Sequence, residues 1–287
     1  MKKTLFFYVY CDINVKDIYS IYKIHFECIK TYKHIFNDII FILGFNENDI
    51  SNTNFVNEWK TYIINFIDFD KELTFKLVNN HSLYRECIHF INEVFINLDT
   101  FDGLICWGHS KRDLTYNQEY IQNWVIMLHY QLYSNVDEVE NILLSDNNIC
   151  TVGPLSTHLN FNQIFYTGAF FWWYPKKILK LHLDEYKNIL NYFKTANYFN
   201  NLYNYTSDVF QIWAFCEQIN MIFLPLYSIG QKTLIPYMYN HVNNEVMAWH
   251  NVTYYCNFIE DNKDYFYDTF YNDYLTFKSN ILEKIKE

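Results

Sequence analysis

Apolar residues along the chain alternate between short continuous runs and longer stretches with helical spacing. Residues 5–11 and 39–45 are apolar runs of strand length, and both are followed by polar residues. Between them, residues 15–36 place apolar side chains three and four positions apart, which is the spacing of an amphipathic helix. Buried strands that alternate with helices are typical of a parallel sheet. The first part of the chain therefore predicts an α/β fold.

The same patterns extend along most of the chain. Further strands are expected at residues 73–78, 103–107, 148–152 and 221–224, and either one strand or a strand and a turn at 165–173. Helices are expected at residues 56–64, 81–98, 117–133, 136–144, 183–199, 207–219 and 265–286. The expected fold is a Rossmann-like, mostly parallel sheet flanked by helices, followed by a helical C-terminal extension.

Composition and charge narrow the classes of function. Hydrophobic residues make up 51% of the 287 residues and charged residues 19%, which is typical of a globular protein with a sizeable core. The formal net charge of -10 argues against nucleic acid or an anionic membrane as the main partner. The 7 cysteines are scattered without a Cys-x-x-Cys pair, which favours free thiols in a reducing compartment and argues against a zinc site.

The apolar run near the start of the chain resembles the core of a signal peptide. It is short, however, and no small-residue cleavage site follows it, so a first strand is the better interpretation. No apolar stretch approaches the length of a membrane-spanning helix. We therefore expect no transmembrane segment and a cytoplasmic location, which would be the host cytoplasm if the chain is viral.

A cluster of basic and hydroxyl side chains follows the strand expected at 103–107. Gly108 is followed by His109, Ser110, Lys111 and Arg112, and the last of these is one of only two arginines in the chain. Ligands of α/β proteins bind at the carboxyl ends of parallel strands. Because lysine and arginine recognise phosphate well, an anion such as a phosphate is the natural ligand of this cluster. The alternative interpretation is a solvated loop with ordinary surface cations.

The aromatic segment at residues 165–173 supports two interpretations that are compatible with each other. In an extended strand, Tyr166, Gly168, Phe170 and Trp172 would share one face, with Thr167 on the other face. Both faces are apolar, as in a central strand of the core. The glycine would let a ligand approach the backbone closely, so the segment could also line a sugar pocket.

Asp68-Phe69-Asp70 has the letters of an Asp-x-Asp site that holds a divalent metal on a nucleotide sugar. Such triplets also arise by chance in a chain rich in aspartate, and we favour that interpretation. Motifs of common serine hydrolases, zinc proteases, P-loop enzymes and dinucleotide oxidoreductases do not occur in the sequence.

Four segments form an ordered series through the middle of the chain. These are residues 107–111 at the end of a predicted strand, Trp124 with Met127 and Tyr130 in the next helix, residues 150–153, and residues 165–172. In this order and spacing they resemble nucleotide-sugar-dependent glycosyltransferases of the glycosyltransferase-A fold, which build surface polysaccharides in bacteria and glycans in large viruses. The match covers about residues 75–225 and is moderately specific.

The chain also departs from the family pattern at two positions. Arg112 stands where the family has a glycine, and Gln211 stands where it has an acid two residues before a tryptophan. The second departure leaves the catalytic base open, with Asp208 as the nearest acid and Glu217 as the alternative.

The resemblance implies a catalytic unit over residues 1–227 and a C-terminal extension over 228–287. Residues 1–115 would bind the nucleotide and residues 116–227 the acceptor. The implied reaction transfers a sugar from a nucleotide diphosphate sugar, of the UDP or GDP type, to a hydroxyl of a glycan.

The resemblance also implies roles for individual residues. Tyr8, Tyr10 and Asp12 would hold the base and ribose, and His109, Ser110, Lys111 and Arg112 would face the diphosphate. Tyr166, Thr167, Gly168, Phe170 and Trp172 would line the sugar pocket. Metal dependence stays open, because Mn²⁺ or Mg²⁺ at Asp68 and Asp70 and a metal-independent mechanism based on the cationic cluster are both compatible with the sequence.

Two other classes of function remain. A degenerate member of the same fold would bind a glycan or a protein without catalysis, and the Gln211 substitution favours this alternative. A structural or assembly protein would use its aromatic surfaces for self-association.

Overall fold

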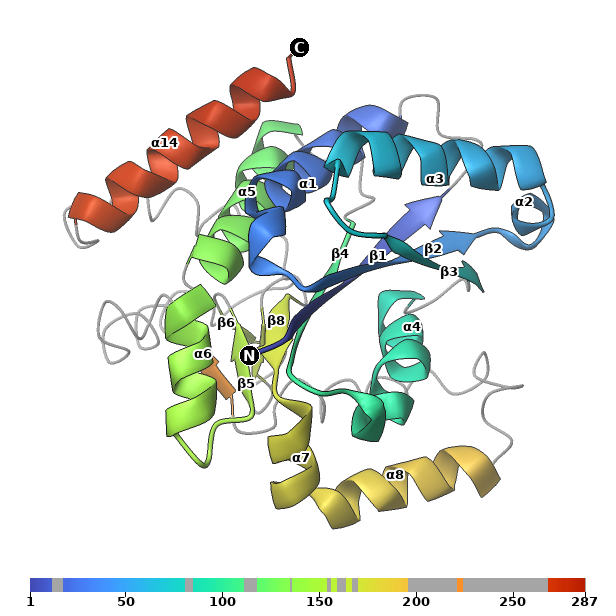
Figure 1. The fold of residues 1–287 in the computed structure, drawn as a ribbon, viewed down its shortest axis with the longest axis vertical. Helices are drawn as coiled ribbons and strands as arrows, with labels where there is room; N and C mark the ends of the chain where they lie inside the picture. Colours follow the sequence, from blue (N-terminus) through green and yellow to red (C-terminus); the bar gives the residue numbers. More distant parts are fainter. Residues whose placement is uncertain are drawn as a thin grey trace.

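The computed structural model describes residues 1–11, 18–80, 85–110, 118–134, 136–153, 156–158, 164–166, 170–195, 221–223 and 268–286. In this part of the chain, a seven-stranded sheet lies between two layers of helices (Figure 1). The strands of this sheet are β1 (Lys3–Cys11), β2 (Asp38–Phe45), β3 (Thr74–Asn79), β4 (Leu104–His109), β5 (Thr151–Gly153), β8 (Phe171–Trp173) and β9 (Met221–Phe223). Two further short strands, β6 (Ser156–His158) and β7 (Ile164–Tyr166), pair with each other.

Helices connect and cover the strands. They are α1 (Ile18–Tyr32), α2 (Glu47–Ile50), α3 (Thr53–Ile67), α4 (Arg85–Glu93), α5 (Gln118–Ser134), α6 (Val136–Ser145), α7 (Pro175–Leu181), α8 (Leu183–Thr195) and α14 (Asp268–Lys284). Two 3₁₀ helices, η1 (Lys33–Ile35) and η2 (Phe95–Thr100), follow α1 and α4. No helix of the described ranges has both the length and the apolar character needed to cross a membrane.

The sheet is mostly parallel, with the strand order β3-β2-β1-β4-β8-β5-β9. The first four strands in this order run parallel, β8 runs antiparallel to both of its neighbours, and β9 is parallel to β5. This arrangement confirms the expected α/β, Rossmann-like sheet flanked by helices. In this order, β2 and β3 lie on one side of β1, and β4 pairs with β1 on the other side.

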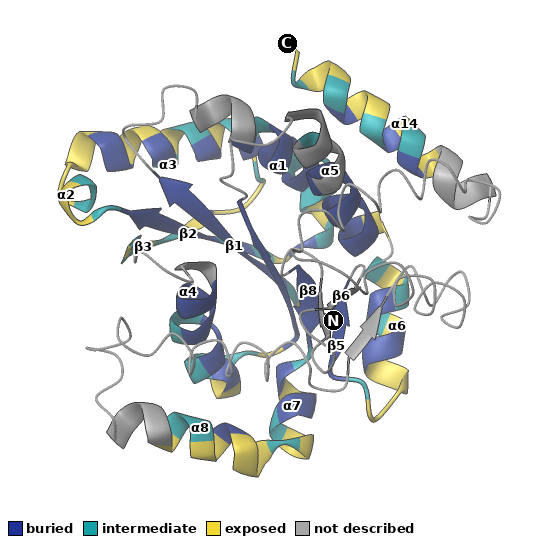
Figure 2. Cartoon of the chain, turned by 180° about the vertical axis from the view of Figure 1, so that it is seen from behind, coloured by how far each residue is buried: buried dark blue, intermediate teal, exposed yellow. Residues whose placement is uncertain are grey.

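The sheet separates two apolar cores because both of its faces are covered. On β1, Phe7 and Val9 belong to the core beneath α1, α3, α5 and α14, whereas Phe6 and Tyr8 belong to the core beneath α4, α7 and α8. Figure 2 shows the central strands as buried along their length, between helices whose outer faces are exposed. Strands buried on both faces explain why their sequences are continuous apolar runs instead of alternating ones.

The C-terminal helix α14 packs on α1 and α5 (Figure 1). The ring of Phe277 lies 5.2 Å from that of Tyr130 on α5 and 5.4 Å from that of Tyr32 on α1, measured between centroids. The Lys284 ammonium lies 3.2 Å from the buried carboxylate of Glu27 on α1. The end of the chain therefore adds an outer layer to one face of the fold.

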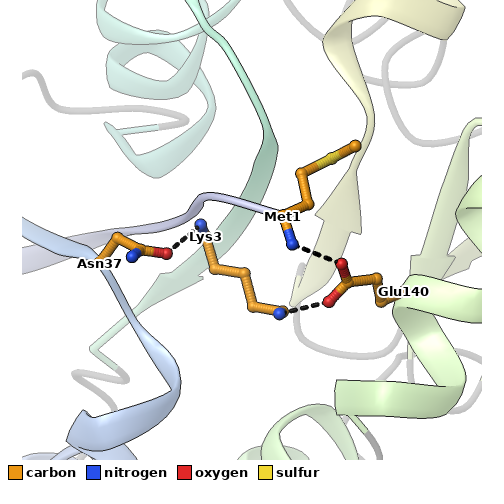
Figure 3. Close-up of polar contacts among 4 residues, drawn as sticks. All are labelled: Met1, Lys3, Asn37 and Glu140. Atoms are coloured by element: carbon orange, nitrogen blue, oxygen red, sulfur yellow. Dashed lines mark hydrogen bonds and ion pairs between the residues drawn. The ribbon is translucent and has the colours of Figure 1, made fainter.

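The start of β1 is held by polar contacts from two other elements (Figure 3). The backbone N–H of Lys3 donates to the Asn37 side chain at 2.8 Å. The Glu140 carboxylate on α6 accepts from the Met1 amine at 2.6 Å and also pairs with the Lys3 ammonium. Although partial burial alone would raise the pKa of Glu140, the hydrogen bonds from Lys3 and the amine bring this pKa below its ordinary value. These contacts tie α6 to the first strand of the sheet.

Two of the expected elements are each divided into two elements in the structure. The segment at 165–173 is split between two sheets, because β7 pairs with β6 and β8 lies in the main sheet. The helix expected at 81–98 ends at Glu93 and is followed by the 3₁₀ helix η2, which lets Phe95 pack on Trp173. The short elements α2, α7 and β6 were not expected, and the helix expected at 207–219 lies outside the described residues.

If α14 is part of the folded unit, removing its central aromatic contact will destabilise the whole protein. We expect Phe277→Ala to lower the free energy of unfolding by about 3 kcal/mol, because it removes a buried ring from between two tyrosines. Urea denaturation followed by circular dichroism measures this change. The exposed Ser279 on the same helix provides the control, since Ser279→Ala should change stability by less than about 0.5 kcal/mol. Equal effects of the two substitutions would show that α14 is not docked.

Candidate functional site

The candidate site lies where the order of the parallel strands reverses direction. From β1 the chain adds β2 and then β3 on one side, and it then crosses over to place β4 on the other side of β1. The carboxyl ends of β1 and β4 therefore lie at a topological switch point, which is where open α/β sheets bind their ligands. The segment that begins at His109 leaves β4 at this place, and α1 and α5 are the helices that follow the two strands.

Ser110 ties the end of β4 to β1. Its backbone N–H donates to the Tyr8 carbonyl at 2.8 Å, and its Oγ accepts from the Tyr10 backbone N–H at 3.1 Å. These two bonds extend the parallel pairing of β1 and β4 beyond the last residue of β4. The buried Ser110 is thus fixed to the sheet next to the end of β1.

Tyr8 and Asn80 form a polar clasp across the ends of β1, β2 and β3. The Tyr8 hydroxyl donates to Asn80 Oδ1, and Asn80 Nδ2 donates to the Gly44 carbonyl at 2.6 Å. The Asn80 backbone N–H donates to the Phe45 carbonyl at 2.6 Å. On the other side, the His89 ring of α4 stacks on the Tyr8 ring at 5.2 Å.

The clasp depends on a close approach at Gly44. A Cβ atom at this position would overlap Asn80 Oδ1 and would lie 2.6 Å from Tyr8 Oη. Only glycine therefore lets the amide of Asn80 reach both the tyrosine hydroxyl and the carbonyl of β2.

Tyr10 is the second candidate tyrosine on β1, and it is also engaged. Its hydroxyl lies 3.4 Å from Asn46 Oδ1, just after β2, and its carbonyl accepts from the Tyr22 hydroxyl of α1 at 2.6 Å. Together with the clasp, this contact forms a polar layer at the carboxyl ends of β1, β2 and β3. The third member of the predicted nucleotide group, Asp12, lies outside the described residues.

The side chain of His109 packs against an aromatic ring. The residue is 3% exposed, and the centroid of its ring lies 5.7 Å from that of Phe170. Gly108 permits this packing, since a Cβ atom there would lie 3.0 Å from the Phe170 ring and 3.1 Å from the Phe7 ring. The glycine before the histidine thus brings Phe170 against the end of β4.

Two residues assigned to the sugar pocket are parts of the core. Phe170 and Trp172 are both fully buried, and the Trp172 indole N–H donates to the Leu132 carbonyl of α5 at 2.9 Å. Tyr166 lies at the end of β7, opposite Ser156 of β6.

Several of the predicted site residues lie outside the described part of the chain. These are Lys111, Arg112, Thr167, Gly168, Asp208 and Glu217. Their assignment therefore stays a prediction.

Asp68 and Asp70 lie far from the switch point in the topology. They stand in the turn between the end of α3 and the start of β3, which is at the amino ends of the parallel strands. Asp68 ends α3 with a φ of 48°, and its exposed carboxylate lies 3.6 Å from the Lys33 ammonium. Among the described residues, no group of three or more potential ligands could hold a metal ion. The structure therefore does not bring this pair to the same edge as His109.

The buried thiols near the site are not suited to nucleophilic chemistry. Burial raises the pKa of Cys11 at the end of β1 and of Cys106 within β4 well above the ordinary value. A thiol held neutral in an apolar environment is inert at neutral pH.

The sequence did not single out the residues that support Tyr8 and Tyr10. Asn46 and His89 belong to no motif, and the contact between Asn80 and Tyr8 joins residues 72 positions apart. The one available signal was Gly44 at the end of a predicted strand, since a glycine in that place can mark a close approach.

Gly44→Ala tests the clasp. We expect it to lower the free energy of unfolding by about 1–3 kcal/mol, because the new methyl group displaces Asn80 and the Tyr8 hydroxyl. Chemical denaturation of the single variants and of the double variant with Asn80→Ala measures the coupling between the positions. The cost of Gly44→Ala should shrink when Asn80 has already been truncated. An undiminished cost would show that the collision with Asn80 is not its cause.

Searches with this chain found no matching family model, no matching curated protein and no matching solved structure. The functional assignment therefore depends on the site itself and on the ordered motifs of the sequence.

Proposed function

We propose that this protein is a glycosyltransferase of the glycosyltransferase-A type, which transfers a sugar from a nucleotide diphosphate sugar to a hydroxyl of a glycan. The observation that carries this proposal is the position of the Gly108-His109-Ser110 segment at the switch point between β1 and β4. The α/β sheet by itself is compatible with many activities. The ordered sequence motifs, together with this position, favour a sugar transferase among these activities.

The donor would bind across the carboxyl ends of the first four strands. Ser110 fixes the segment that continues into Lys111 and Arg112, so these cations would start from a rigid point beside β1. They would bind the diphosphate and stabilise the negative charge that develops as the nucleotide leaves. The helices α1 and α5 follow the two strands, and their positive N-terminal ends would favour the same anion.

The base and ribose would bind over the polar layer formed by Tyr8, Tyr10 and Asn80. These side chains are held by contacts with β2, β3 and α4, so their hydrogen-bonding groups are ordered before a ligand arrives. Preorganised groups lose less entropy on binding. Because Phe170 and Trp172 are buried, we assign the sugar to the segment with Tyr166, Thr167 and Gly168.

The acceptor would bind beside a carboxylate that serves as the catalytic base. Asp208, with Glu217 as the alternative, would deprotonate the acceptor hydroxyl in an inverting reaction. A divalent ion at Asp68 and Asp70 would lie at the amino edge of the sheet, away from the proposed diphosphate, so we do not assign this pair to the reaction. If Mn²⁺ or Mg²⁺ takes part, other ligands would hold it, and otherwise Lys111 and Arg112 would provide the positive charge.

Binding of UDP and GDP by isothermal titration calorimetry tests the donor site. We expect Lys111→Ala to weaken binding about 10- to 100-fold, the effect of losing one charge-assisted hydrogen bond to phosphate. Lys71→Ala is the matched control. The Lys71 ammonium donates to the Asn37 carbonyl at the opposite edge of the sheet, so it should not contribute to nucleotide binding.

Three outcomes of this experiment have different meanings. Binding together with slow hydrolysis of a sugar nucleotide would support the transferase. Binding without hydrolysis or transfer to any glycan would favour a degenerate binding module. No heat with any nucleoside diphosphate or its sugar, with and without Mn²⁺, would overturn the proposal.

A further inference from the structure

Two buried histidines join the helices that flank the switch point. His25 Nδ1 on α1 and His129 Nε2 on α5 lie 2.8 Å apart, at hydrogen-bonding distance. The His25 side chain is 1% exposed and that of His129 is fully buried. A histidine pair of this kind needs one ring nitrogen to donate and the other to accept.

Aromatic rings enclose the pair. The centroid of the Phe7 ring lies 5.4 Å from that of His25 and 5.9 Å from that of His129. Phe170 stacks on His25 at 6.4 Å and meets the His129 ring edge to face at 5.2 Å. The same Phe170 ring contacts His109, so the pair lies directly beneath the end of β4.

His129 has only one of its two ring nitrogens engaged. Its Nδ1 atom is buried and has no hydrogen-bond partner within the described residues. The lower-cost tautomer has Nε2–H donating to His25, which leaves Nδ1 as an unprotonated acceptor. A second proton would place a charged and unpartnered N–H among Phe7, Tyr133 and Phe170.

Among the described residues, the titratable groups around the pair offer His129 no compensating charge. Burial raises the pKa of Tyr133 on α5, of Cys28 on α1 and of Cys106 on β4, so these groups are neutral at neutral pH. Other titratable groups on the packed elements have contacts of their own: Glu27 with Lys284, Tyr130 with Phe277, and His109 with Phe170.

We propose that His25 and His129 form an acid-sensitive latch, which holds α1 against α5 while both rings are neutral and releases the two helices when protons are taken up. This role does not depend on sugar transfer. It follows from a buried hydrogen bond between two titratable rings at the contact of the helices that continue from β1 and β4.

The direction of the pH effect follows from the burial of His129. Burial lowers its pKa from 6.5 to about 3 in the folded protein. In the unfolded chain, His129 therefore takes up a proton near pH 6.5, whereas in the folded protein it stays neutral until the pH is about 3. The stability that depends on neutral His129 is thus present above pH 6.5 and is lost as the pH falls from 6.5 towards 3. Between pH 7 and pH 5, His129 alone should increase the unfolding equilibrium constant about 25-fold.

A double substitution separates the hydrogen bond from the titration. In His25→Asn/His129→Gln, the asparagine amide replaces Nδ1 of the first ring, and the glutamine amide replaces Nε2 of the second. The two amides can keep the hydrogen bond, and neither takes up a proton in this range. His34→Gln is the matched control, because His34 is an exposed histidine on η1, outside the pair.

The unfolding equilibrium constant is measured by urea denaturation at pH 7, 6 and 5. We expect its increase between pH 7 and pH 5 to be at least about 25-fold smaller in the double variant than in the wild type, and unchanged by His34→Gln. Hydrogen exchange, corrected for its intrinsic pH dependence, should show that the amides of α1 and α5 lose protection before those of β1 and β2. The same pH dependence in the wild type and the double variant would overturn the latch.

A second measurement keeps the proposal testable if the double variant does not fold. The Cε1–H resonances of the wild-type histidines can be followed by NMR between pH 8 and pH 5. We expect the His129 resonance, assigned with a His129→Gln sample or by selective labelling, not to titrate in the folded protein over this range. An ordinary titration near pH 6.5 would also overturn the latch.

Discussion

The parallel pairing of β1 with β4 is the constraint on which the rest of the site depends. This pairing continues beyond β4, because Ser110 bonds to both Tyr8 and Tyr10 of β1. It creates the switch point, and it fixes His109 and Ser110 next to β1. It also directs α1 and α5 onto the same face, where they pack on each other and on α14. The candidate site is therefore a consequence of strand order as much as of the residues that line it.

Aromatic rings and polar side chains together order the carboxyl edge of the parallel strands. On one face, His89 stacks on Tyr8, whose hydroxyl bonds to Asn80. On the other face, Phe170 lies among three histidines, one of which is His109. Each arrangement has a glycine near the end of a strand. A Cβ atom at Gly44 would overlap Asn80, and one at Gly108 would crowd the Phe170 and Phe7 rings at 3.0 and 3.1 Å. An aromatic-rich sequence with few glycines thus places two of them where close approach is required.

Much of the sheet could be predicted from the sequence, because strands buried on both faces read as continuous apolar runs and the helices carry their own spacing. The same continuity concealed the change of sheet between β7 and β8, since an apolar run does not show where a chain leaves one sheet for another. The position of His109 at the end of a strand could be predicted, because the apolar run of β4 ends there, and the role of this segment in binding phosphate stays a prediction. The pairing of Tyr8 with Asn80 and that of His25 with His129 could not be found, because the partners lie 72 and 104 positions apart and local patterns contain no trace of such contacts.

A crystal structure of the protein with a nucleoside diphosphate and Mn²⁺ would show where the donor binds. We expect the diphosphate between the carboxyl ends of β1 and β4, next to Ser110, with the base over Tyr8 and Tyr10. A nucleotide bound instead at Asp68 and Asp70, at the opposite edge of the sheet, would overturn the proposed donor site. So would an empty switch point in crystals that are saturated with the ligand.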